Sequence, residues 1–333
     1  MTRAGVNGGS FMLLPDRAAL IGRDADISEI SDRLGPGVIT LTGVGGVGKT
    51  TLALAVADAV DDRYGDVFVC ELAGVFEASG IDDAVADAIG AFRLDDASAV
   101  DAVASVLRGR SALLVLDNVE QVVGGAGRFV SSLLAVCPGL AVMVTSREPL
   151  RIAGEDVCQV DPLDVDRDAP TLFVHVASSF APERDLATHG DAIREICRGL
   201  DGLPLAIELA ASRLTTMDVT DVRDGLDRRF GLLRREGAVD RHATLAATVR
   251  WSYDLLASHE RRLFDRLSAF QGGFDLAGAV ALSGGTGEPA AIERDVAAVL
   301  NSLTDKSMLV RRDRVEGPRW EILETLRHFG DRQ

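Results

Sequence analysis

The segment from residue 38 to residue 60 constrains the fold of this chain more than any other. A short run of β-branched and apolar residues at 38–42 leads directly into the glycine-rich sequence 43–50, and a helical pattern follows. The pattern G-x-x-x-x-G-K-S/T between a strand and a helix is typical of a loop that wraps a phosphate group. A glycine-rich turn that binds nothing is the alternative, and the complete match in its required context argues against it. We therefore predict an α/β domain whose P-loop binds ATP or ADP.

The loop residues have separate chemical roles. Backbone N–H groups of the glycine-rich turn can surround the β-phosphate, and the following helix adds the positive end of its dipole. Lys49 places an ammonium within reach of the β and γ oxygens, and the hydroxyl of Thr50 is a ligand for Mg2+. The residues predicted to bind the nucleotide here are Gly43, Gly45, Gly46, Val47, Gly48, Lys49, Thr50 and Thr51.

A second metal ligand is expected at the end of a neighbouring strand. The apolar run at 112–116 ends on Asp117, and a carboxylate in that place can hold Mg2+ through water. An ordinary aspartate at a helix start is the alternative, but the P-loop upstream favours the metal. Thr50 and Asp117 are therefore the predicted metal site.

The residues after Asp117 bear on hydrolysis. Asn118 stands where many hydrolytic P-loop ATPases have a second carboxylate, and an amide is a poor general base. Glu120 can serve instead, although a surface carboxylate is an equal interpretation. The sequence thus supports nucleotide binding more than rapid hydrolysis.

An arginine follows the strand expected at 140–145. Arg147 in this position can reach a γ-phosphate and report its presence. Ligands of open α/β sheets bind at the carboxyl ends of the strands, which favours this role over that of a surface arginine. The predicted catalytic set is Lys49, Asp117, Glu120 and Arg147.

Strands and helices alternate over the first half of the chain, which predicts a parallel five-stranded sheet. The expected strands are at 38–42, 67–72, 112–116, 140–145 and 157–160. The expected helices of this region are at 24–34, 50–60, 81–92, 97–107 and 128–136.

The second half has a different character. Residues 169–230 show only helical periodicity, interrupted at 199–204. Helices are then expected at 243–256, 259–269, 276–282 and 292–303. Two short strands at 307–310 and 320–323, around a charged turn with Gly317 and Pro318, complete a winged-helix pattern. We therefore expect a lead-in (1–17), a P-loop nucleotide-binding domain (18–165), a small helical domain (166–232) and a winged-helix domain (233–333).

Charge and composition limit the partners. The formal net charge is −16, and all of it lies before residue 231 because the remainder has equal numbers of basic and acidic residues. A field of that sign repels nucleic acid, and we do not expect direct DNA binding. No apolar run has the length of a membrane span, and the N-terminal residues lack a signal-peptide pattern. We expect a cytoplasmic protein that does not contact membranes.

These motifs together resemble the STAND class of signalling ATPases, and in particular its NB-ARC branch. The resemblance is carried by residues 43–52, 113–121, 145–147 and 202–206, which occur in the order of that family. The runs 116–120 and 251–256 are most similar to bacterial members, many of which are transcriptional regulators. The resemblance covers about residues 18–330.

The resemblance implies a nucleotide-binding domain, a small helical domain and a winged-helix domain that close over ADP. Ile21, Gly22 and Arg23 match the family segment beside the adenine, Pro204 matches the proline that contacts the base or ribose, and Arg147 matches the sensor arginine. It also implies that exchange of ADP for ATP opens the protein and allows self-association.

The sequence differs from the family pattern at two positions, and it ends inside an expected helix. The family places Met-His-Asp in its last domain, whereas the matching stretch 322–324 has Leu323 in place of the histidine. Asn118 replaces the second acid. The chain stops inside a helical pattern that starts at 321, so we expect a truncated chain whose sensor or effector domain is missing.

Three functions are compatible with these residues. The first is a nucleotide-gated switch, the regulatory core of a signalling or transcription-regulating protein, with ATP or ADP and Mg2+ as ligands and slow hydrolysis at most. The second is an ordinary P-loop ATPase or kinase-type enzyme, which would need a substrate pocket or a clear base. The third is a DNA-binding winged-helix regulator, which the absence of a basic cluster at 292–303 disfavours.

Overall fold

The computed structural model divides the chain into two compact units. The first takes in residues up to 44 together with 48–161, and the second takes in 45–47 and the residues from 162 onward. The structure describes residues 20–91, 99–183, 185–226, 249–250, 252–254, 256–270, 273–285, 288–306, 308–314, 317–322 and 326–327. Among these residues, no helix combines the length and the apolar character needed to cross a membrane.

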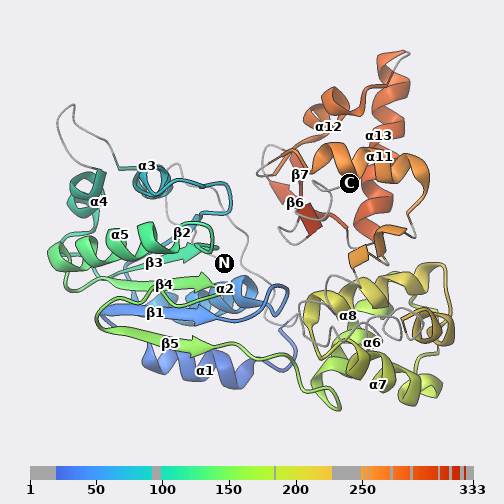
Figure 1. The fold of residues 1–333 in the computed structure, drawn as a ribbon, viewed down its shortest axis with the longest axis horizontal. Coiled ribbons are helices and arrows are strands. Elements are labelled where there is room, and N and C mark those ends of the chain that lie inside the picture. Colours follow the sequence, from blue (N-terminus) through green and yellow to red (C-terminus); the bar gives the residue numbers. More distant parts are fainter. Residues whose placement is uncertain are drawn as a thin grey trace. The chain divides into compact units, whose positions relative to one another are not determined.

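A sheet of five parallel strands, in the order β2-β3-β4-β1-β5, forms the first unit (Figure 1). The strands are β1 (Gly37–Thr42), β2 (Asp66–Glu71), β3 (Ala112–Asp117), β4 (Ala141–Ser146) and β5 (Glu155–Gln159). The central strands β3 and β4 are buried along their whole length, as expected where helices cover both faces of a parallel sheet. The predicted five-stranded parallel sheet is confirmed.

Helices lie on both faces of this sheet. One face is covered by α3 (Ser79–Ile89), α4 (Ala99–Leu107) and α5 (Val123–Val136), and the other by α1 (Asp24–Arg33) and α2 (Lys49–Ala59), which pack against each other (Figure 1). Alternate strand residues such as Leu114, Leu116 and Val142 share one apolar core with the side chains of α3, α4 and α5. Because successive side chains of a strand point to opposite faces, each buried strand provides apolar contacts to the helices on both sides of the sheet.

The start of α5 was predicted wrongly. The sequence indicates a helix only from residue 128, yet α5 begins at Val123 and includes three glycines in its first turns. A Cβ at Gly125 would lie 2.6 Å from the Cβ of Ala78, and one at Gly127 would lie 3.1 Å from Cγ2 of Ile152. These glycines therefore allow close packing of the helix rather than a loop.

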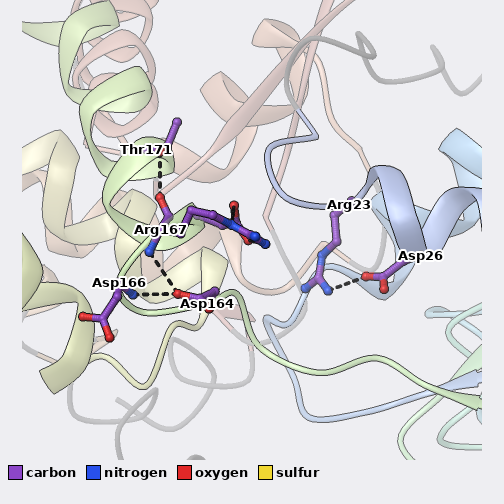
Figure 2. Close-up of polar contacts among 7 residues, drawn as sticks. Arg23, Asp26, Asp164, Asp166, Arg167 and Thr171 are labelled. Atoms are coloured by element: carbon purple, nitrogen blue, oxygen red, sulfur yellow. Dashed lines mark hydrogen bonds and ion pairs between the residues drawn. The ribbon is translucent and has the colours of Figure 1, made fainter.

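The second unit begins with a helical group. It contains α6 (Asp168–Phe180), α7 (Gly190–Gly199) and α8 (Pro204–Ala211), with short 3-10 turns at Ala187–His189 and Ser212–Thr215. Asp164 orders the turn that precedes α6, because its Oδ1 accepts from the backbone N–H groups of Asp166 and Arg167, each at 2.9 Å (Figure 2). These two hydrogen bonds hold the pKa of the Asp164 carboxyl below its usual value.

Further along the second unit, the described residues include three helices and a hairpin. The helices are α11 (Ser258–Leu267), α12 (Leu276–Ser283) and α13 (Pro289–Asp305). The hairpin pairs β6 (Val310–Arg314) with β7 (Gly317–Glu321) in antiparallel fashion. The helix expected at 243–256 lies largely outside the described residues, as do Trp251 and Leu323.

The hairpin is displaced from its predicted position. The strand expected at 307–310 starts only at Val310, since Met308 is buried and its backbone N–H donates to Leu303 O at the end of α13. The charged residues assigned to a turn form β6 instead, and Gly317 and Pro318 belong to β7. The register places the buried Trp320 opposite Arg311, so burial of one aromatic side chain decides the pairing.

Candidate functional site

The glycine-rich loop lies between the end of β1 and the start of α2. Gly43, Gly46 and Gly48 have φ values of 154°, 76° and 96°, a region that residues with a Cβ rarely adopt. Helix α2 begins at Lys49, directly after Gly48. The loop therefore has the conformational freedom and the helix N-terminus that a phosphate-binding site requires.

Lys49 turns its side chain back over this loop. Its Nζ donates to the backbone O of Gly43 at 2.9 Å and to that of Val44 at 3.2 Å. The ammonium is thus held at the mouth of the loop by neutral carbonyl groups. A phosphate oxygen would be a stronger, charge-assisted acceptor in the same place.

Asp117 lies beside the first turn of α2. Its side chain ends β3 and is buried, and its Oδ1 accepts from Thr50 Oγ1 at 2.8 Å. The two predicted metal ligands are therefore in direct contact. A hydroxyl and a carboxylate suit Mg2+, which takes few protein ligands and completes its shell with water and phosphate oxygens. The described residues contain no cluster of three or more His, Cys, Asp or Glu side chains that could hold a metal ion alone.

Thr145 is a site residue for which no role was predicted from the sequence, although it belongs to the motif at 145–147. Its hydroxyl donates to Asp117 Oδ1 at 2.6 Å and accepts from the backbone N–H of Asn118 at 2.8 Å. Asn118 has φ 63°, so the chain turns sharply just after the carboxylate. Thr145 is almost fully buried at the end of β4, next to β3. Two signals could have indicated its role: a hydroxyl residue at the end of an expected strand, and its place directly before Ser146 and Arg147 in the motif at 145–147.

Glu120 and Arg147 form an ion pair. Arg147 Nε lies 2.8 Å from Glu120 Oε2, with 44% of the arginine side chain and 14% of the glutamate side chain exposed. The two residues follow β3 and β4, respectively. The structure therefore brings together two members of the predicted catalytic set.

The predicted adenine-side segment is held through its arginine. Gly22 has φ 73°. The buried guanidinium of Arg23 donates to Asp26 Oδ2 at 2.8 Å (Figure 2). It also donates to Asp161 O at 2.8 Å. Ile21 and Gly22 precede this anchor and leave their backbone groups as the candidates for contact with a base. Arg23 itself is engaged within the protein.

Pro204 occupies the first position of α8 in the second unit, where its missing N–H removes no helical hydrogen bond. Gly202 has φ 66°, and a Cβ there would lie 2.2 Å from Leu163 O, so only glycine fits the turn before this helix. Residues 45–47 of the glycine-rich loop group with this unit. Within it, the backbone N–H of Leu205 donates to Gly46 O at 3.2 Å.

Two predicted contacts have no visible side-chain role in the site. Thr51 is exposed on α2, and Val47 is buried in the loop. The side chain of Val47 therefore contributes to packing, and its backbone N–H is the group predicted to contact the phosphate.

Comparison with known proteins identifies the domain. The NB-ARC domain profile matches residues 23–166. The chain is 40% identical over 298 residues to a Mycobacterium tuberculosis protein named as an HTH-type transcriptional regulator, with 88% of this chain and 33% of that protein covered. An uncharacterised protein of Mycobacterium tuberculosis is 38% identical over 273 residues, covering 79% of this chain and 68% of that protein.

Two further matches are more distant. The regulatory protein AfsR of Streptomyces coelicolor is 29% identical over 315 residues, covering 86% of this chain and 30% of AfsR. A STAND protein with a tetratricopeptide repeat sensor from Pyrococcus horikoshii has a similar fold, with a TM-score of 0.57, 18% identity, and coverage of 95% of this chain and 43% of that chain. The chain spans about a third of the length of the regulator-named relatives.

The complete glycine-rich loop, the matched domain and these relatives agree on one assignment. The chain belongs to the NB-ARC family, with relatives named as regulators in mycobacteria and Streptomyces.

Proposed function

We propose that this chain is the nucleotide-gated core of a regulator, in which exchange of ADP for ATP changes the conformation and allows self-association. The observation that carries the proposal is the contact of Thr50, Asp117 and Thr145 beside the glycine-rich loop. In this proposal the loop and Lys49 bind the phosphates, and Thr50 and Asp117 hold Mg2+. The metal would neutralise phosphate charge when bound.

The same geometry favours slow hydrolysis over rapid turnover. Asn118 has no carboxylate to accept a proton from water, and Glu120 is paired with Arg147. A carboxylate stabilised by a guanidinium is a weaker base than a free one. The site is thus suited to retaining a nucleotide, which is what a switch needs.

The proposed organisation is that of the family. Residues 18–165 would form the nucleotide-binding domain, 166–232 a small helical domain that contributes Pro204, and 233–333 a winged-helix domain. The three helices α11, α12 and α13 followed by the β6-β7 hairpin support the last assignment. A sensor or effector partner would supply the signal and the output, in the cytoplasm.

The test is to identify the nucleotide in freshly purified protein and to titrate it with Mg2+-ADP and with a non-hydrolysable ATP analogue. We expect bound ADP that exchanges over minutes, and loss of binding by at least about 100-fold in Lys49→Ala, because a charge-assisted contact to phosphate disappears. Arg110→Ala, which removes only a surface pair with Asp66, is the control. Steady turnover at about 1 per second or faster, within the range of ordinary enzymes, would contradict a switch.

A further inference from the structure

The ion pair between Glu120 and Arg147 lies at the carboxyl ends of β3 and β4, beside the start of the glycine-rich loop. In the register of β1 and β4, Thr42 is opposite Ser146, so Arg147 follows at the level of Gly43, where the glycine-rich loop begins. Glu120 comes three residues after Asp117 on the neighbouring strand end. Both side chains therefore belong to the edge of the sheet that carries Lys49, Thr50 and Asp117.

A guanidinium bound to a carboxylate is not free to bind a phosphate. Arg147 would have to leave Glu120 Oε2, at 2.8 Å from its Nε, or share its donors between the carboxylate and the phosphate. The side chain of Glu120 is much less exposed than that of Arg147. When the ion pair opens, water therefore solvates the carboxylate of Glu120 poorly, and opening the pair costs free energy. The cost of this rearrangement falls on a nucleotide with a γ-phosphate.

We propose that Glu120 is a specificity-determining residue, which competes with the γ-phosphate for Arg147 and thereby sets the preference of the site for ATP over ADP. This inference rests on the proposed function, since it assigns a role within the same nucleotide site. ADP leaves the ion pair intact, whereas ATP binding includes its opening. A difference of this kind between two ligands is what shifts a conformational equilibrium.

The test compares the affinities of Mg2+-ADP and of a non-hydrolysable ATP analogue by calorimetry, using the full chain. In Glu120→Gln, the amide keeps the size of the side chain but binds the guanidinium weakly. We expect the ratio of ATP-analogue to ADP affinity to rise about fivefold, the upper range for one partly exposed ion pair. Glu120→Asp, which shortens the reach of the carboxylate, should shift the ratio in the same direction by less.

The matched control is Glu148→Gln. Glu148 is in the loop just after Arg147, but it is paired with Arg151 at 3.4 Å and is more exposed than Glu120. Its substitution removes the same charge from the same edge without releasing Arg147. The affinity ratio should therefore not change.

A double-mutant cycle separates competition for Arg147 from general repulsion of phosphate. In an Arg147→Gln background, Glu120→Gln should no longer raise the ratio, because the group in competition is gone. An increase of the same size in that background, or in Glu148→Gln, would overturn the proposal in favour of charge repulsion. An unchanged ratio in Glu120→Gln with both nucleotides still bound would overturn this inference alone, whereas a wild-type chain that binds neither nucleotide would overturn the proposed function as well.

Discussion

The two units of this protein place their polar groups differently. In the first unit the central strands β3 and β4 are apolar until their last residues, and the buried polar side chains Asp117 and Thr145 lie at their carboxyl ends. In the second unit, charged side chains are buried among helices, as at Arg213 and Glu260. Buried polar groups at the carboxyl ends of parallel strands lie where ligands of such sheets bind, whereas the hydrogen bonds of Arg213 and Glu260 join separate segments of the second unit.

Glu260 is the centre of the buried polar group in the second unit. Its carboxylate accepts from the backbone N–H of Ala257 at 2.7 Å, from Ser302 Oγ at 2.6 Å and from Lys306 Nζ. Burial raises the pKa of this carboxyl, but the hydrogen bonds from Lys306, Ser302 and Ala257 outweigh burial, and the net pKa lies below its usual value. The charged carboxylate of Glu260 therefore connects α11 to the C-terminal end of α13.

Arg213 is a second buried charge of this unit. It is 2% exposed, and its guanidinium donates to Ser252 O at 3.2 Å. Burial lowers the pKa of Arg213 to about 10, an effect that the charge of Glu260 partly offsets. The hydrogen bond joins the turn after α8 to residue 252, so one side chain ties the helical group to a later segment of the same unit. The comparison predicts that substitutions of Glu260 and Arg213 mainly lower folding stability. Substitutions at the carboxyl ends of β3 and β4 should mainly weaken nucleotide or Mg2+ binding.

The largest effect is expected from Glu260→Ala. Removing one partner of a buried ion pair leaves Lys306 uncompensated, which costs about 3–5 kcal/mol of folding stability. Urea denaturation without nucleotide measures this loss. Glu260→Gln, which keeps one acceptor oxygen, should lose less, and a loss below about 1 kcal/mol in Glu260→Ala would show that the cluster behaves like a surface pair.

Thr145→Val should act on the metal more than on the fold. The valine has the same shape, but Asp117 loses a donor and the N–H of Asn118 loses its acceptor. Hydrogen bonds to charged groups contribute about 1.5–3 kcal/mol, so we expect the Mg2+ concentration for half-maximal nucleotide binding to rise about tenfold. Titration of Mg2+ at fixed ADP measures this.

Two variants control for general damage to the sheet. Thr145→Ser retains the hydroxyl and should restore the Mg2+ dependence. Thr40 is buried in β1 and its hydroxyl has no hydrogen-bond partner, so Thr40→Val should not weaken Mg2+ binding. If Thr40→Val and Thr145→Val weakened Mg2+ binding equally, the hydrogen bond from Thr145 would not be what positions Asp117 for the metal.

Glu208→Gln should stabilise the second unit in a pH-dependent way. The residue is only partly buried as a whole, yet burial of its carboxyl raises the pKa to about 7 from 4.5. Because the folded state then holds the proton more tightly than the unfolded state, stability falls as pH rises from about 4.5 to above 7. The variant should exceed the wild type by about 1–3 kcal/mol at pH 8 and by much less at pH 5.

Thermal melts at several pH values measure this difference. Glu195→Gln, at an exposed position of α7, is the control and should give the same small change at every pH. A constant difference between Glu208→Gln and the wild type from pH 5 to pH 8 would show that the Glu208 carboxyl is solvated in the folded state.

The smallest effect is expected at the outermost strand β5, where Asp156 pairs with Arg33. Arg33 of α1 donates to both carboxylate oxygens of Asp156 on β5, at 3.0 and 2.5 Å, and the hydrogen bond from Arg33 holds the pKa of Asp156 below its usual value. The pair is substantially exposed, so Asp156→Asn should cost less than about 1 kcal/mol. Its contribution is present at neutral pH and is lost as pH falls through the lowered pKa. High salt should reduce the effect, and a salt-independent loss would argue against an ion pair.

Much of the first unit could be predicted because its signals are local. The alternation of strands and helices and the glycine-rich loop depend on residues close together in the sequence. The errors arose where distant residues decide. The glycines of α5 are explained only by the approach of Ala78 and Ile81 to Gly125, and the hairpin register depends on burial of Trp320 and on pairing of Phe274 with it.

The sequence by itself determined the parallel sheet and the loop that Lys49 and Thr50 complete, because the spacing of these residues permits few other folds. Only the tertiary structure shows that Thr145 donates a hydrogen bond to Asp117, and that Glu120 and Glu260 form ion pairs with Arg147 and Lys306, respectively. The physical reason is that each of these contacts joins residues brought together by the packing of whole elements. A short-range pattern records which element a residue belongs to, whereas the neighbour that neutralises or orients its side chain is set by three-dimensional packing.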